Sequence, residues 1–101
     1  MNPDLEHSYA ELNDEELMRR VSAGEKLAFE LLYDRYAASV MGQVLKMLQD
    51  TGRAEEAVLE TFWQIWSQAY LFQLHPAKFV DWLRLTAHRE ATRIRQQNHR
   101  S

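Results

Sequence analysis

The feature that most constrains how this chain folds is a long apolar pattern with helical spacing in its first half. Between Lys26 and Gln49, apolar side chains recur every three or four residues, the spacing that places them on one face of an α-helix. These side chains are Phe29, Leu32, Tyr33, Tyr36, Val40, Val44, Met47 and Leu48. Asp50 and Gly52 follow, residue types that commonly separate helices. The pattern therefore predicts a helix from about Lys26 to Gln49.

Three other segments carry the same signal and predict further helices. The first covers residues 13–24, from an Asn13 or Asp14 cap to a closing glycine, and the second covers about 53–70. The third covers about 76–97, because proline is tolerated in the first turn of a helix. The side chains expected in the core are Leu17, Met18, Val21, Ala54, Val58, Phe62, Ile65, Trp66, Ala69, Phe79, Leu83, Ala87 and Ile94, with Trp82 and Thr86 at its margin. The predicted fold is all-α, a compact bundle of about four helices.

Composition narrows the class of protein. A length of 101 residues suits one domain, and only 3 Gly and 2 Pro argue against a β-sandwich with its many turns. The absence of cysteine excludes disulfides and thiolate metal sites. No apolar run approaches the roughly 18 residues that cross a bilayer, and the acidic start lacks the apolar segment of a secretory signal. We therefore expect a cytoplasmic protein without membrane insertion, with a flexible acidic leader at 1–12 and one domain at 13–97.

Charge is distributed unevenly along the chain. Residues 1–16 hold six acidic residues and no Lys or Arg, whereas residues 76–101 hold six Lys and Arg against two acids. A basic C-terminal segment is typical of a polyanion-binding surface. A solvated helix face explains the same charges equally well.

Catalytic patterns are absent from the sequence. The histidines, His7, His75, His88 and His99, form no HxxxH or HExxH pair. Glu55 and Glu56 are adjacent and, on a helix, point about 100° apart, so they are not placed to share a proton. No glycine-rich phosphate loop or GxSxG motif occurs. We expect no enzyme activity, no catalytic residue, no metal and no cofactor.

The last predicted helix has a more informative pattern. Its basic residues, Arg84, His88, Arg89, Arg93 and Arg95, are spaced by four or seven in two series, which predicts basic stripes along one side. Phe79 and Trp82 stand at its start. Basic side chains neutralise phosphates and aromatic rings stack on unpaired bases, a combination typical of single-stranded nucleic-acid binding. The alternative is that the aromatic rings belong to the core and the arginines only face solvent.

Three sequence blocks carry a resemblance to a known family. Residues 14–36 contain DEELMRRV, GE and AFELLYDRY; residues 54–66 read AEEAVLETFWQIW; residues 79–87 read FVDWLRLTA. In this order and spacing they resemble region 2 of bacterial extracytoplasmic-function (ECF) sigma factors, with its A-E-D-L-V-Q-E-x-F-x-x-x-W and F-x-x-W-L-x-x-I-A patterns. The resemblance covers about residues 14–97.

The resemblance implies a sigma factor domain that binds core RNA polymerase and melts the promoter −10 element. Its third helix would dock on the clamp helices of polymerase, through Glu55, Glu56, Leu59, Glu60, Trp63 and Gln64. The following loop and the last helix would hold the non-template strand and a flipped base, through Phe72, Gln73, Lys78, Trp82, Arg84, His88, Arg89 and Arg93. An anti-sigma factor is a further implied partner.

The chain departs from the family pattern at several of these positions. Arg53 replaces an acidic residue, Leu59 replaces the glutamine of V-Q-E, and Gln73 stands where aspartate is common. Arg89 and Arg93 replace the Asn and Asp of an R-N-x-x-x-D-x-x-R pattern. The extra positive charge suits phosphate contact, whereas the base contact of that Asn is not implied for Arg89.

Two questions stay open at the level of sequence. The family has a second helical domain that reads the −35 element, and residues 98–101 fall where its linker would begin. We expect the sequence to be part of a longer chain, the alternative being a stand-alone region 2. The alternative function is a helical interaction module without promoter activity, bound by an anti-sigma-type regulator or self-associating through Leu59, Trp63 and Tyr70.

Overall fold

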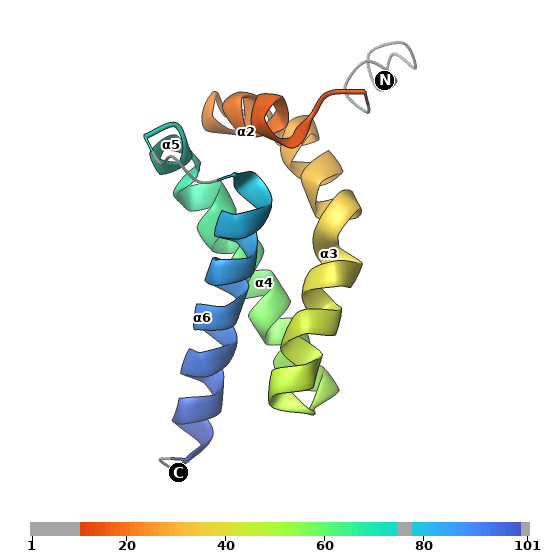
Figure 1. The fold of residues 1–101 in the computed structure, drawn as a ribbon, viewed down its shortest axis with the longest axis vertical. Helices are drawn as coiled ribbons and strands as arrows, with labels where there is room; N and C mark the ends of the chain where they lie inside the picture. Colours follow the sequence, from red (N-terminus) through yellow and green to blue (C-terminus); the bar gives the residue numbers. More distant parts are fainter. Residues whose placement is uncertain (1–10, 75–77, 100–101) are drawn as a thin grey trace.

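The structure is a computed structural model that describes residues 11–74 and 78–99. The described residues form α2 (Asp14–Ser22), α3 (Lys26–Leu48), α4 (Thr51–Ser67), α5 (Ala69–Phe72) and α6 (Phe79–His99), and no strand. Helices α3, α4 and α6 pack against one another along the length of the molecule, and α2 lies across one end (Figure 1). The predicted all-α bundle is confirmed.

Local capping residues set the start of α2 and α4. The Asn13 side chain accepts a hydrogen bond from the Glu16 backbone N–H at 2.8 Å, and the Asp50 side chain accepts one from the Arg53 N–H at 2.9 Å. Each cap satisfies a backbone donor that the first turn leaves unpaired. Helix α4 therefore begins at Thr51, two residues before the predicted start.

Helix α3 ends where its backbone turns left-handed at Gln49, with φ of 53°. The α2–α3 turn closes at Gly24, whose φ of 89° favours glycine. Gly42 lies in the middle of α3 without a neighbour, because a Cβ built there meets nothing within 4 Å. The helix does not use Gly42 for close packing.

The core lies between α3, α4 and α6. Its fully buried side chains include Leu32, Val44, Ile65, Phe79 and Leu83. Thr86 and Ala91 are buried as well, which makes the apolar face of α6 wider than its predicted stripe. The Thr86 hydroxyl is satisfied because it donates to the Trp82 carbonyl at 2.8 Å.

The segment after α4 differs from the prediction. Instead of one helix to Tyr70 followed by a loop, α4 stops at Ser67, Gln68 leaves the helical conformation, and α5 follows. The break turns Phe72 into the core, where its ring stacks on Trp82 at 5.6 Å. Pro76, expected to open the last helix, and residues 1–10 of the expected leader lie outside the described residues. Helix α6 extends through His99, into the segment where a linker was expected.

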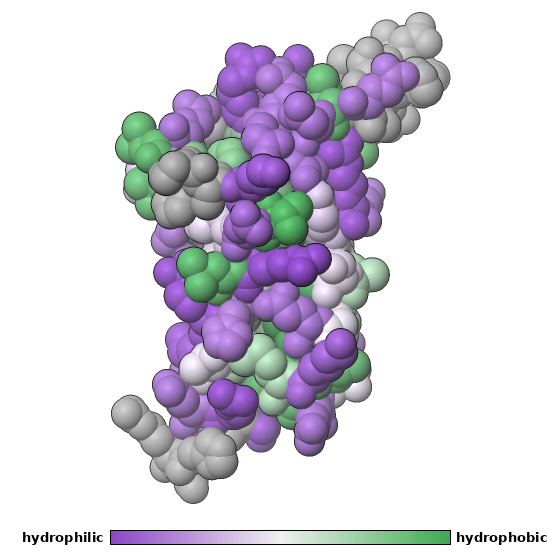
Figure 2. Space-filling view, viewed as in Figure 1, coloured by the Kyte–Doolittle hydropathy of each residue, from purple (hydrophilic) through white to green (hydrophobic). Residues whose placement is uncertain are grey.

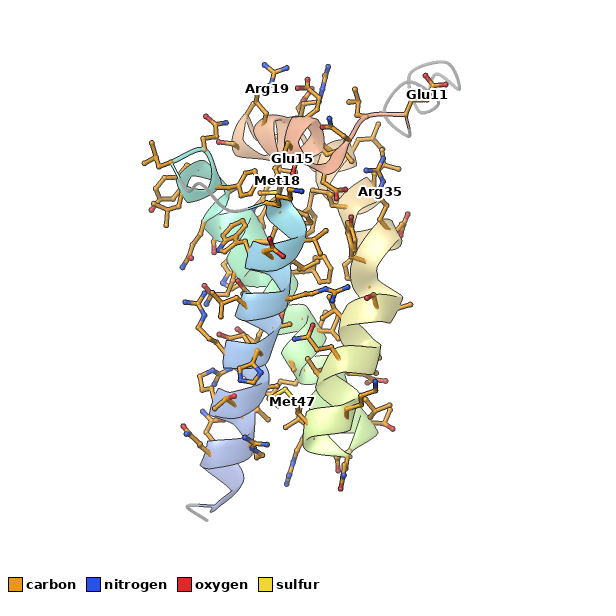
Figure 3. The ribbon with its side chains drawn as sticks, in the orientation of Figure 1. Glu11, Glu15, Met18, Arg19, Arg35 and Met47 are labelled. Carbon is orange, nitrogen blue, oxygen red and sulfur yellow. The ribbon has the colours of Figure 1, made fainter. Side chains whose placement is uncertain are left out.

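Polar contacts attach α2 to α3. An Arg35 Nη atom lies 3.0 Å from the Asp14 carboxylate, and another donates to the Leu12 carbonyl at 2.6 Å. The Tyr36 hydroxyl donates to the same Asp14 carboxylate. Figure 3 shows Arg35 on α3 pointing towards the segment that enters α2. Burial of Tyr36, together with its bond to Asp14, raises the pKa of the phenol to about 12.

None of the helices in the described part of the chain is long and apolar enough to span a membrane.

Candidate functional site

The outer face of α4 exposes large apolar side chains among acidic ones. Leu59 is 64% exposed and Trp63 is 60% exposed, although both belong to a helix that otherwise contributes much of the core. Glu56 is exposed and Glu60 is half-buried. An exposed tryptophan in a domain this small is the kind of residue that protein interfaces use as an anchor.

The six polymerase-facing candidates spread over the whole outer half of α4. Glu56 and Glu60 are four residues apart and share one side of Trp63. Glu55 and Glu60 are five residues apart, which at about 100° per residue separates them by roughly 140°. Glu55 therefore does not share an acidic strip with Glu56 and Glu60, and it turns towards α3, where it lines a hollow with Tyr33 and Met41.

A groove of about 340 Å³ runs between α3 and α4 beside these residues. It is apolar, with a single cation at its rim, and its lining residues are Lys26, Phe29, Tyr33, Leu59, Phe62, Trp63 and Trp66. Its walls are held by edge-to-face ring contacts, with Phe29 at 5.2 Å from Trp66 and Tyr33 at 4.8 Å from Phe62. Apolar side chains of a partner helix fit such a groove.

Sequence reasoning missed the contribution of α3 to this groove. Phe29 and Tyr33 were predicted only as part of the apolar face of residues 26–49, and both are partly buried and line the groove with Leu59. The available signal was the width of the apolar arc on residues 53–70, which exceeded what one neighbouring helix covers.

The basic residues of α6 lie on two flanks of the helix and not on one side. Arg84 and His88 face a hollow shared with α3. Arg89 follows Arg84 by five residues, roughly 140° around the helix, and Arg93 lies four residues beyond Arg89 on that second flank. Arg93 is also paired, with its Nη2 atom 3.1 Å from the Glu90 carboxylate. The prediction that the basic stripes lie along one side of the helix is therefore wrong.

The aromatic candidates of the DNA set are core residues. Phe72 and Trp82 are each 8% exposed and stack on each other with an interplanar angle of 24°. Phe79, at the base of the same cluster, is fully buried. The structure therefore agrees with the alternative left open by the sequence, in which these aromatic rings belong to the core.

Other side chains stand at the surface beside this cluster. Gln73 and Lys78 are exposed, as are three large apolar side chains of the same end of the bundle, Tyr70, Leu71 and Leu74. The surface of this end is therefore formed by Gln73, Lys78 and the exposed apolar residues, whereas Trp82 is buried.

Metal ligation has no support in the described residues, where no group of three or more His, Asp or Glu side chains gathers.

This arrangement is that of a small helical domain with one apolar and acidic surface and one basic helix. Comparison with known proteins shows an ECF sigma factor-like domain. The chain is 36% identical over 75 residues to "ECF RNA polymerase sigma factor SigK" of Mycobacterium tuberculosis H37Rv, an alignment that covers 74% of this chain and 40% of that protein. Proteins of the same name from Mycobacterium ulcerans and Mycobacterium sp. strain KMS are 33% and 34% identical over 82 residues.

These matches cover most of this chain but less than half of each relative. They cover 80% of this chain for the last two proteins, but the chain spans only 40 to 44% of the length of these relatives. No family model and no solved structure matches the chain.

Proposed function

We propose that this chain is the part of an ECF-type sigma factor that binds core RNA polymerase and engages the promoter −10 element during transcription initiation. The observation that carries the proposal is the exposed pair Leu59 and Trp63 beside an apolar groove on α4. This helix contains the sequence block that resembles the polymerase-binding helix of the family. The similarity to proteins named ECF RNA polymerase sigma factors supports the same assignment.

The polymerase contact is proposed to combine an apolar centre with acidic edges. Leu59 and Trp63 supply the apolar area, and the groove takes side chains from a helix of the clamp coiled coil. Interfaces of this type draw most of their binding energy from a few buried aromatic anchors, while charges at the rim select the partner. Glu56 and Glu60 provide that charge for basic clamp helices, with Glu55 and Gln64 at the two borders.

The DNA contact is proposed to use α6 and the residues before it. Arg84, His88 and Arg89 supply phosphate contacts, and exposed Gln73 and Lys78 stand where the non-template strand would enter. Phe72 and Trp82 act as support for this end of the bundle, because both are buried. Base specificity from an Asn at position 89 is not part of the proposal.

A second candidate function uses the same α4 surface. An anti-sigma-type regulator, or a second copy of the chain, would also bury Leu59, Trp63 and the groove between α3 and α4. Under this alternative the basic helix α6 has no role in DNA binding.

A pull-down with the isolated clamp-helix coiled coil separates these functions. Glu56→Lys/Glu60→Lys and, separately, Trp63→Ala should lose most of the captured coiled coil. Glu15→Lys, which changes an exposed acid on α2, is the charge control and should bind like the wild type. All variants should keep their helical circular dichroism, because surface substitutions rarely change stability by more than about 0.5 kcal/mol. Full retention by the double reversal and by Trp63→Ala would place the dock elsewhere.

A further inference from the structure

Another hollow lies between α3 and α6. Its volume is about 670 Å³, and its lining residues are Ser39, Gly42, Gln43, Lys46, Met47, Arg84 and His88. The face over α3 and α6 is largely hydrophilic, with only scattered hydrophobic residues (Figure 2). Met47 lies between the two helices at the lower end of this face (Figure 3). None of the residues contributed by α3 belongs to the surfaces considered above.

The charge at this hollow is positive and not neutralised. Lys46, Arg84 and His88 are exposed, and the lining contains no acidic residue. Within residues 11–74 and 78–99, no carboxylate forms an ion pair with these three side chains. Four other arginines of the described residues form ion pairs with carboxylates: Arg19, Arg20, Arg35 and Arg93.

The acidic residues nearest in sequence do not neutralise the charge at this hollow. Glu90 on α6 is already paired with Arg93, on the other flank of the helix. Asp81 is exposed, three residues before Arg84, and forms no ion pair with it. Asp50, beyond the end of α3, caps the first turn of α4. The cations Lys46 and Arg84 are therefore available to an external anion, and the His88 side chain lies beside them.

The two helices are held in register at this point. The Gln43 side-chain amide on α3 donates to the Arg84 backbone carbonyl on α6 at 2.9 Å. This bond joins the two helices beside the hollow and uses only the backbone of Arg84, so the exposed Arg84 side chain takes no part in it. Gly42 lines the hollow, and the space beside it is open, because a Cβ at that position meets nothing within 4 Å.

We propose that this hollow binds the phosphodiester backbone of a DNA strand, with Lys46 as a DNA-contacting residue on α3 opposite Arg84 and His88. Arg84 and His88 are four residues apart, which places their side chains about 5–6 Å from each other at the Cβ atoms. Arg95 continues the same flank, eleven residues and roughly 20° from Arg84. The cations therefore form a track that suits a strand. Arg89 and Arg93 do not share this track.

This inference rests on the proposed DNA contact and adds a helix to it. The strand would run over α3 and one flank of α6, so α3 would serve polymerase on its α4 side and DNA on its α6 side. Lys26 and Lys46 make the division testable, because both are exposed lysines of α3 and they line the two different hollows.

Fluorescence anisotropy of a labelled oligothymidylate strand, measured with the 101-residue chain over a range of salt concentrations, tests the proposal. Lys46→Gln should weaken binding several-fold at low salt and reduce the slope of log K against log salt by about 0.7, the value for one single-strand phosphate contact. Lys26→Gln removes the same charge from the same helix and should behave like the wild type.

A second pair of variants tests the hollow itself without removing a cation. Gly42→Glu places a carboxylate among Lys46, Arg84 and His88, whereas Gly42→Gln adds nearly the same volume without charge. Both residues favour helix over glycine, so both variants should fold. Gly42→Glu should weaken binding much more than Gly42→Gln, and inorganic phosphate at matched ionic strength should not displace the strand.

The outcomes separate this inference from the proposed function. If the wild type binds the strand and Lys46→Gln and Gly42→Glu bind equally well, the α3 contact is wrong and the proposed function stands. If inorganic phosphate displaces the strand, the hollow is a general anion site and the strand assignment is overturned. If the wild type neither binds the strand nor captures the clamp coiled coil, the proposed function fails with it.

Discussion

Phe72 and Trp82 stack on each other, with ring centroids 5.6 Å apart and ring planes at 24°. Phe72 belongs to the four-residue helix α5 and Trp82 to the first turn of α6, so the stack joins these two helices. Phe79 packs edge-on against both rings, at 6.1 and 6.5 Å. The three rings pack α5 against the start of α6. Trp82 therefore acts through packing.

Two tryptophan substitutions should differ strongly in their effect on stability. Trp82→Ala removes a buried ring and should lower the free energy of unfolding by about 3–5 kcal/mol. Trp63→Ala removes an exposed ring and should change it by about 0.5 kcal/mol or less. Urea unfolding followed by circular dichroism measures both. Equal stability of the two variants would show that the Phe72–Trp82 stack does not hold α5 in place.

The helices with strong local signals were predictable from the sequence. Asn13, Gly24 and Asp50 act on the backbone within a few residues of themselves, so the ends of α2 and α3 agree with their predicted positions to within about two residues. The break at Gln68 was not predictable in this way. No glycine or proline marks it, and the burial of Phe72 against distant Trp82 accompanies it. A tertiary contact outweighs local helix propensity there.

The candidate site was predictable only as far as spacing within one helix allows. Spacing by four correctly grouped Arg84 with His88 and Arg89 with Arg93, but the two pairs are offset by five residues and diverge around α6. Lys46 was not predicted as a site residue, because its position near Arg84 depends on how α3 and α6 pack. The same limit applies to Phe29 and Tyr33, which form the groove only once α4 lies beside them.

Gly42→Ala should stabilise the protein. Gly42 lies inside α3, where glycine costs about 0.5–1 kcal/mol relative to alanine, and the added methyl group meets nothing within 4 Å. The unfolding free energy should rise by about that amount in a urea titration. Gly24→Ala is the opposite control, because its φ of 89° is strained for alanine and the variant should be destabilised. A loss of stability in Gly42→Ala would mean that a neighbour does approach α3 at this point.

Asp50→Ala should weaken the start of α4. The Asp50 side chain accepts the hydrogen bond of the Arg53 N–H, and loss of such a cap costs about 1 kcal/mol. Asp50→Asn and Asp50→Ser keep a capping oxygen and should recover most of the loss. If alanine, asparagine and serine variants unfold at the same urea concentration, the bond contributes nothing to stability.

Tyr36 should make stability fall at high pH. Its pKa is raised from 10.0 to about 12 in the folded protein, by burial and then by its hydrogen bond to Asp14, so the folded state holds the phenolic proton more tightly than the unfolded state. The stabilisation is complete below pH 10, where both states are protonated, and decreases as the pH rises through about 12.

Tyr36→Phe should be less stable near neutral pH by about 1 kcal/mol, because Asp14 loses a donor, and its stability should depend less steeply on pH above 10. Tyr70→Phe, which alters an exposed tyrosine, should follow the wild-type curve. In unfolding free energies measured from pH 8 to pH 12, the wild type should therefore lose its advantage over Tyr36→Phe as the pH rises. Parallel curves would show that Tyr36 titrates alike in the folded and unfolded chains.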